Sequence, residues 1–148
     1  MGRTMVGAFI VLLLAYPASA DDDPLKEDLA AIQGKWAVKL TDQDGEPVRA
    51  VKEIKGNRET YTLFKGEEIV LKREVDIKLS RADNKVRICT VTRVTSVKGP
   101  EEGRTFDVDQ SYAYKTVGDF FIEVDSILID KNFEGLPPQL VAWRRVKK

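Results

Sequence analysis

The chain has 148 residues, a length that suits one domain, and its 24 Lys and Arg residues balance 24 Asp and Glu. This even charge gives no basic stripe of the kind that binds nucleic acid, so we expect no nucleic-acid partner. The chain contains no histidine, which excludes histidine-based acid–base catalysis, histidine-activated nucleophiles, histidine-ligated haem and most zinc sites. We therefore expect a protein that is not an enzyme and that uses no cofactor or metal.

The N-terminal segment, residues 1–20, has the pattern of a secretory signal peptide. Arg3 supplies a positive charge, residues 6–15 form an apolar run, and Ala18-Ser19-Ala20 is a small-x-small cleavage site. The run is shorter than the roughly 20 residues that cross a bilayer, and no later segment is longer, so we expect no membrane anchor. The alternative is an N-terminal core helix. Cleavage near Ala20 predicts a secreted or periplasmic protein whose single domain covers residues 21–148.

The remaining chain predicts one short helix followed only by strands. Leu25, Leu29 and Ile32 recur at helical spacing, and Gly34 ends the helix. From Trp36 onward the apolar residues alternate with polar ones, which is typical of strands. The expected strands are residues 36–40, 48–55, 58–64, 69–79, 85–97, 105–117, 120–130 and 140–146. Short turns and the absence of a crossover helix favour an up-and-down antiparallel barrel or a sandwich.

Several polar side chains occupy positions where this alternation predicts the interior. They are Arg73, Thr90, Thr92, Gln110, Tyr112 and Tyr114. Buried polar groups need hydrogen-bonding partners, so these residues either pair with one another or line a ligand cavity. A β-bulge in the strand of Arg73 would instead turn that side chain to the outside.

The single cysteine and two neighbouring carboxylates are further candidates for chemistry. Cys89 cannot form an internal disulfide, so it is either a buried inert thiol or a thiol that forms an intermolecular disulfide or responds to oxidants. Asp107 and Asp109 share one face of a strand whose other face is aromatic and aliphatic. Alternation of this kind indicates a solvated face rather than a pair of catalytic carboxylates.

Two short motifs, one near each end of the predicted domain, carry a family resemblance. Gly34-Lys35-Trp36 follows the helix and resembles the Gly-x-Trp signature of lipocalins and other calycins. Together with the signal peptide, the segments DLAAIQGKW and DGEPV and the terminal WRRV make the chain most similar to the planctomycete lipocalin-like domain family of small secreted proteins. This family has no established activity, so the resemblance implies a fold and a compartment but no mechanism.

The resemblance implies a lipocalin/calycin-like, all-β, up-and-down barrel of about eight strands with a short N-terminal helix. In such barrels Trp36 would plug the closed end, and a basic residue near the chain's end would cover its indole. Arg145 is the better candidate for that residue and Arg144 the fallback. A guanidinium over an indole makes a cation–π contact.

Two classes of function agree with these observations. In the first, the barrel binds a small hydrophobic, amphipathic or anionic ligand, with the six interior polar residues fixing its polar head and Arg73 facing a carboxylate. In the second, the barrel is solid and acts as an interaction protein, such as an inhibitor or cell-envelope component, through the loops at residues 98–104 and 131–139. An open cavity in the structure favours the first class, and a filled interior favours the second.

Overall fold

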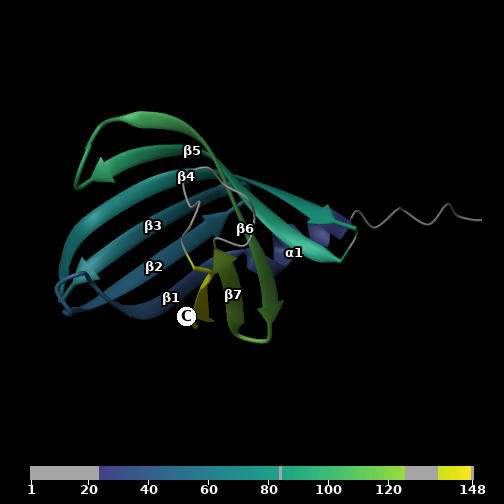
Figure 1. Cartoon of the computed structure of the whole chain (residues 1–148), viewed down its shortest axis with the longest axis horizontal. Helices are drawn as coiled ribbons and strands as arrows, with labels where there is room; N and C mark the ends of the chain where they lie inside the picture. Colours follow the sequence, from purple (N-terminus) through teal and green to yellow (C-terminus); the bar gives the residue numbers. More distant parts are fainter. Residues whose placement is uncertain (1–23, 84, 126–136, 148) are drawn as a thin grey trace, which may run out of the picture.

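The computed structural model describes residues 24–83, 85–125 and 137–147. In this part of the chain one helix precedes eight antiparallel strands, which close into a barrel in chain order (Figure 1). The elements are α1 (Pro24–Ile32), β1 (Gly34–Thr41), β2 (Pro47–Lys55), β3 (Arg58–Lys65), β4 (Glu68–Ala82), β5 (Val86–Lys98), β6 (Thr105–Val117), β7 (Phe120–Asp125) and β8 (Gln139–Arg145). The predicted all-β, up-and-down barrel with a short N-terminal helix is confirmed.

Some of the predictions concern residues that the structure does not describe. The predicted signal peptide at 1–20, the last part of the strand expected at 120–130 and most of the loop expected at 131–139 lie outside the described residues. Within the described part, no helix combines the length and the apolar character that crossing a membrane requires.

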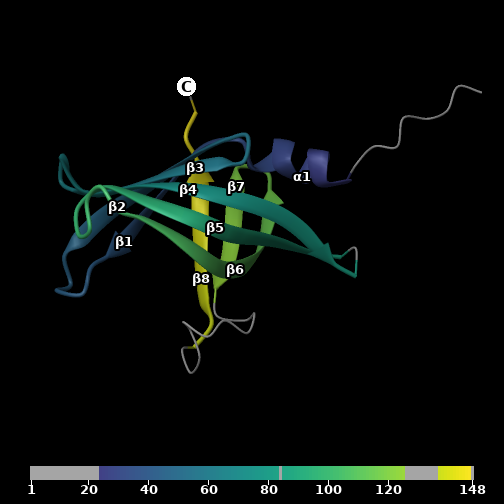
Figure 2. The same cartoon turned by 90° about the horizontal axis from the view of Figure 1, so that it is seen from above.

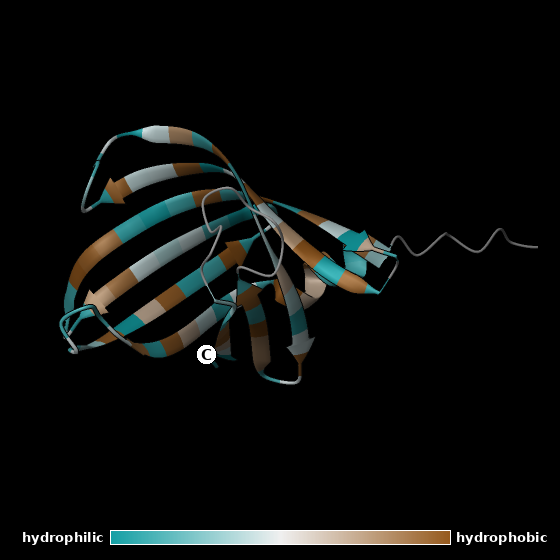
Figure 3. Cartoon of the chain, viewed as in Figure 1, coloured by the Kyte–Doolittle hydropathy of each residue, from teal (hydrophilic) through white to brown (hydrophobic). Residues whose placement is uncertain are grey.

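The alternating sequence explains why most strands bury one face. Along β2, Val48, Ala50, Lys52 and Ile54 are buried while the side chains that alternate with them are more exposed. Figure 3 shows alternating hydropathy along the strands. Successive side chains of a strand point to opposite faces, so a period of two places one set inside the barrel. The inner sets of the eight strands together form the core.

Trp36 closes the end of the barrel next to α1. Its side chain is fully buried, and its indole N–H donates to the backbone carbonyl of Ile32 at 2.8 Å. The guanidinium carbon of Arg145 lies 3.9 Å from the centre of the Trp36 ring. Arg145 also donates to the carbonyl oxygens of Gln33 at 2.8 Å and Ala31 at 3.0 Å, near the end of α1. The roles expected for Trp36 and Arg145 agree with this geometry, whereas Arg144 is exposed.

Gly34 explains why a glycine precedes Trp36 in the motif. Its backbone has a φ of +107°, a conformation that residues with a side chain rarely adopt. A Cβ atom at this position would also lie 3.1 Å from a guanidinium nitrogen of Arg145. The glycine therefore allows both the turn from α1 into β1 and the close approach of Arg145.

A buried ion-pair cluster holds α1 against the barrel. Asp28 of α1 is 2% exposed and accepts hydrogen bonds from Arg81 of β4 at 2.7 Å and from Arg87 of β5 at 2.5 Å. Charged hydrogen bonds of this kind compensate the cost of removing the carboxylate from water. Their joint effect lowers the pKa of Asp28 although burial by itself would raise it.

The barrel wall is weakly joined between its first and last strands. β1 pairs with β2 along its whole length but with β8 at only two positions, Trp36 with Arg145 and Ala37 with Arg144. Figure 2 shows β1 and β8 running in different directions away from this contact. We call this boundary the β1–β8 seam.

Candidate functional site

The barrel interior contains a cavity of about 310 Å³. The cavity is lined by Leu40, Lys52, Glu59, Tyr61, Arg73, Val75, Val91, Val94, Gln110, Tyr112, Glu123, Asp125, Val141 and Trp143. These residues come from all eight strands, and none of them belongs to α1 or contributes to the Trp36 plug. Ligand pockets typically have volumes of about 300–1,000 Å³, so this cavity suits a small molecule.

A buried ion-pair network forms one part of the cavity wall, which we call the charged floor. The Lys52 ammonium of β2 donates to a carboxylate oxygen of Glu123 of β7, and it lies 3.6 Å from a carboxylate oxygen of Glu59 of β3. The other carboxylate oxygen of Glu123 accepts a 2.7 Å hydrogen bond from the indole N–H of Trp143. All three charged side chains are less than 10% exposed.

Aromatic rings surround the ammonium of Lys52. The nitrogen lies 4.3 Å from the ring centre of Trp143, 5.0 Å from that of Phe121 and 5.6 Å from that of Tyr112. Each ring attracts the cation through its negative face, and the attraction is strongest where water is excluded. The aromatic rings and the two carboxylates thus stabilise a fully buried positive charge.

The pKa directions follow from this arrangement. Burial by itself would lower the pKa of Lys52, but the charges of Glu123 and Glu59 outweigh burial and raise it. Burial raises the pKa of Glu59, and the nearby Lys52 offsets this only in part. Burial also raises the pKa of Asp125, and the charge of Glu123 adds to the effect. The two carboxylates therefore favour the protonated, positively charged form of Lys52.

Arg73 lines the cavity, as the alternation of its strand predicts. The β4–β5 pairing does shift register next to Arg73, but the shift leaves its side chain on the cavity side. Within the described residues, Arg73 makes no ion pair and no side-chain hydrogen bond. Its cross-strand neighbour on β3 is Tyr61, another lining residue. The Tyr61 ring packs edge-on against the Trp143 ring, with 6.2 Å between the ring centres.

Gln110 and Tyr112 also line the cavity, as expected, but Tyr114 does not. Tyr114 is buried nearer the Trp36 plug. Its ring packs edge-on against that of Phe121, with 5.5 Å between the ring centres. Among the residues that the structure describes, its hydroxyl oxygen has no hydrogen-bond partner, and burial raises the pKa of the hydroxyl. The prediction that Tyr114 faces the interior is correct, but the residue belongs to the packed end of the barrel.

The prediction that Thr90 and Thr92 face the interior is wrong. Thr90 pairs with Ser111 through their hydroxyls at 2.7 Å, on the face opposite to Cys89 and Tyr112. Thr92 is exposed, and its hydroxyl donates to the carbonyl of Asp76. The β4–β5 and β5–β6 registers both shift around Thr92. A bulge residue changes the phase of alternation, so Val91 before it and Val94 after it both line the cavity.

Cys89 is a buried thiol rather than an exposed one. Its side chain is 0% exposed and lies beside Tyr112 on the neighbouring strand. Burial raises the pKa of the thiol to about 12, while the Tyr112 hydroxyl acts in the opposite direction. A protonated, inaccessible thiol is a poor nucleophile, so the geometry favours the inert alternative.

The sequence reasoning missed Lys52, Glu59, Glu123 and Asp125. The signal that could have found them is the one that identified Arg73, because each charge interrupts an apolar set of fixed parity. Lys52 follows Val48 and Ala50 at steps of two, and Glu123 follows Phe121. Charged residues at such positions are buried only when they are paired, and Lys52 pairs both with Glu59 on the next strand and with Glu123, 71 residues away.

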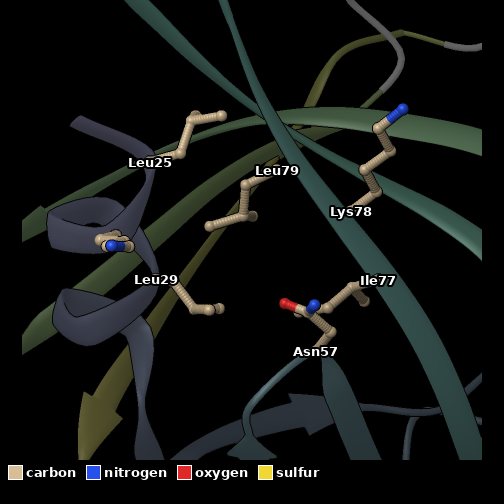
Figure 4. Close-up of a pocket in the computed structure, with 7 residues that line it drawn as sticks. Leu25, Leu29, Asn57, Ile77, Lys78 and Leu79 are labelled. Carbon is tan, nitrogen blue, oxygen red and sulfur yellow. The ribbon is translucent and has the colours of Figure 1, made fainter. Parts of the chain in front are cut away.

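A second hollow, of about 390 Å³, lies between α1 and β4. Figure 4 shows Leu25 and Leu29 of α1 facing Leu79 and Ile77 of β4, with Asn57 and Lys78 at its rim. Its polar lining side chains, those of Lys26, Asn57 and Lys78, include no buried charged group of the kind that lines the barrel cavity. In the described ranges, no group of three or more His, Cys, Asp or Glu side chains could hold a metal ion. The barrel cavity is therefore the better candidate site.

Comparison with known proteins identifies no relative of the chain. No protein-family model, no curated protein and no solved structure matches it.

Proposed function

We propose that the protein is a non-enzymatic binding protein that holds a small amphipathic organic anion in the barrel cavity. The observation that carries this proposal is the position of Arg73, which lines the cavity without an ion-pair partner in the described part of the chain. A guanidinium is always charged at neutral pH, and a partly buried one gains from a bidentate carboxylate. The anionic group of the ligand would therefore lie at Arg73.

The other lining residues suit the body of such a ligand. Tyr61, Trp143 and the valines on β4 and β5 offer apolar and aromatic surface, and Gln110 offers a hydrogen-bonding amide. Lys52 is already neutralised by its two glutamates, so it does not compete with Arg73 for the anion. The cavity volume of about 310 Å³ favours short-chain or small aromatic acids over long-chain lipids.

Fluorescence titration with anilinonaphthalene sulfonate, an aromatic anion, tests this proposal. We expect the wild type to bind the dye and octanoate to displace it. Arg73→Met should keep the fold, judged by circular dichroism, and weaken dye binding by about tenfold or more, the loss expected for one charged contact. Arg93→Met is the matched control, because Arg93 faces solvent and pairs with Asp107 outside the cavity. Equal affinity of Arg73→Met and wild type would contradict the proposal.

A second candidate function is a protein-interaction module that acts through its loops. The loop between β5 and β6 favours it, because Ser96 fixes its shape: the hydroxyl donates to the Pro100 carbonyl at 2.9 Å, and the Ser96 carbonyl accepts from Gly103 at 2.8 Å. This rigid loop presents exposed Glu101, Glu102 and Arg104 side chains. A wild-type protein that binds neither the dye nor octanoate would favour this second function over the first.

We further propose that the chain acts after export, since residues 1–20 have the pattern of a signal peptide. Material exported by the producing cell should begin at Asp21 when its N-terminus is sequenced. Exported protein that still begins at Met1 would contradict this.

A further inference from the structure

A shallow groove of about 380 Å³ follows the β1–β8 seam on the outside of the barrel. Val38 and Lys39 of β1 form one side, and Ala142 and Arg144 of β8 form the other. Arg49 of β2 also lines it and is the cross-strand partner of Lys39. We call this feature the seam groove. It lies on the wall of the barrel, and it shares no lining residue with the interior cavity.

Within the described residues, the two strands that border the seam groove are unpaired along part of their facing edges. Beyond Ala37, residues 38–41 of β1 have a strand neighbour only on the β2 side within the described structure. Likewise, residues 139–143 of β8 pair with β7 but not with β1. A free strand edge offers unpaired backbone N–H and C=O groups, which is the geometry to which an extended peptide can add as a further strand.

The exposed charged side chains that line the seam groove are all positive. Lys39, Arg49 and Arg144 are exposed and line it, and none of its described lining residues is acidic. None of the three makes an ion pair with a described acidic residue. Arg49 stacks on the ring of Phe64 at 4.4 Å, which holds its cation at this surface.

Small and apolar side chains of Ala37, Ala142 and Val146 lie on the same outer face as these cations, whereas Val38 of β1 points to the inner face and packs against the core. Successive side chains of an added strand would point alternately outward, beside Lys39, and inward, beside Val38. Outward positions lie level with Lys39 and Arg144, and the other positions meet apolar atoms. Side chains of a complementary strand would therefore alternate between acidic and apolar.

We propose that the seam groove binds an extended segment of a partner protein in which acidic and apolar residues alternate, added as a strand to the free edge of β1. The backbone groups of residues 38–41 supply hydrogen bonds to the segment. Lys39, Arg49 and Arg144 select its acidic side chains. Binding here is independent of the proposed cavity ligand.

Fluorescence anisotropy with a labelled, alternating valine–glutamate octapeptide tests this inference on the whole protein. We expect saturable binding that weakens as salt is raised, because exposed charge pairs are screened. The same peptide methylated on alternate backbone nitrogens on its pairing edge should bind at least about tenfold more weakly, since it lacks the donors that pair with β1. An alternating valine–lysine octapeptide should not bind.

Two double variants separate the seam groove from general surface charge. Lys39→Glu with Arg144→Glu should abolish binding of the glutamate peptide and allow the lysine peptide to bind. Lys78→Glu with Lys115→Glu changes the net charge equally at exposed positions away from the seam groove and should leave binding unchanged. Circular dichroism establishes that both variants are folded.

Several outcomes would overturn the inference. Equal binding of the methylated and unmethylated peptides would exclude strand addition, and equal loss in the two double variants would reduce the effect to net charge. A dimer in analytical ultracentrifugation without peptide that the Lys39 and Arg144 reversals dissociate would assign the seam groove to a second copy of this chain instead.

Discussion

Two neighbouring layers of the barrel interior, the plug and the charged floor, each place a tryptophan against a cation, but they satisfy those groups differently. At the plug, Trp36 donates to a backbone carbonyl and Arg145 donates to two more, so the polar groups pair with peptide dipoles. At the charged floor, Trp143 donates to Glu123, and Lys52 pairs with Glu123 and Glu59. Backbone carbonyls do not titrate and carboxylates do. The plug is therefore built for stability, whereas the charged floor depends on the protonation of its members.

Removal of Trp36 should produce the largest effect on stability. Trp36→Ala deletes a fully buried ring together with its contacts to Phe121 and Arg145, so we expect a loss of about 3–5 kcal/mol in the free energy of unfolding. Urea titration followed by circular dichroism measures it. A loss below about 1 kcal/mol would mean that the plug is not a main source of stability.

The free energy of unfolding should fall when one partner of the charged floor is removed. Part of it should return when a second partner is neutralised. Lys52→Met leaves Glu59 and Glu123 buried without their cation, and we expect a loss of about 3 kcal/mol, limited by protonation of one carboxyl. Adding Glu123→Gln to Lys52→Met should restore part of the loss, because one buried charge disappears while an oxygen remains for Trp143. Urea titrations of wild type and both variants measure these changes, and no recovery in the double variant would contradict this account.

A smaller, pH-dependent effect on stability should have opposite signs beside the plug and in the charged floor. The pKa of Asp28, beside the plug, is lowered, so its ionisation stabilises the fold above the unfolded value of about 3.9 and this stability is lost as pH falls through the lowered pKa. The pKa of Glu59, in the charged floor, is raised by burial, so stability declines as pH rises from the unfolded value of about 4.3 toward the raised one.

Urea titrations of Asp28→Asn and Glu59→Gln across the acid range measure these contributions as differences from wild type. Relative to wild type, Asp28→Asn should lose stability as pH rises to about 4 and then remain level. Glu59→Gln should instead gain stability relative to wild type as pH rises above about 4.3. Difference curves with the same slope would show that the two carboxyls do not differ in the way the structure indicates.

The elements of the fold followed from local patterns, which is why they could be predicted. Alternation in β4 correctly placed Arg73 inside, and the Gly34-Lys35-Trp36 motif with Arg145 correctly placed the plug. Both depend on periodicity or on contacts near the start and end of the barrel, where one short motif specifies the geometry.

The parts of the site that could not be predicted depend on register and on distant pairing. The bulge at Thr92 reverses the phase of β5, and no turn residue marks it in the sequence. Lys52 and Glu123 are 71 residues apart, so each alone resembles a charge on a solvated face. Only closure of the barrel brings β2 and β7 near enough for their charges to cancel.

The two tryptophans give the most direct test of the central claim, that the plug is structural and the cavity binds the ligand. The chain contains only Trp36 and Trp143, so its NMR spectrum has two indole N–H resonances, one from the plug and one from the charged floor. Titration with octanoate should shift the Trp143 resonance in a saturable way and leave that of Trp36 unchanged. In Arg73→Met, the same titration should leave both unchanged. A shift at Trp36, or an undiminished shift at Trp143 in Arg73→Met, would contradict the account.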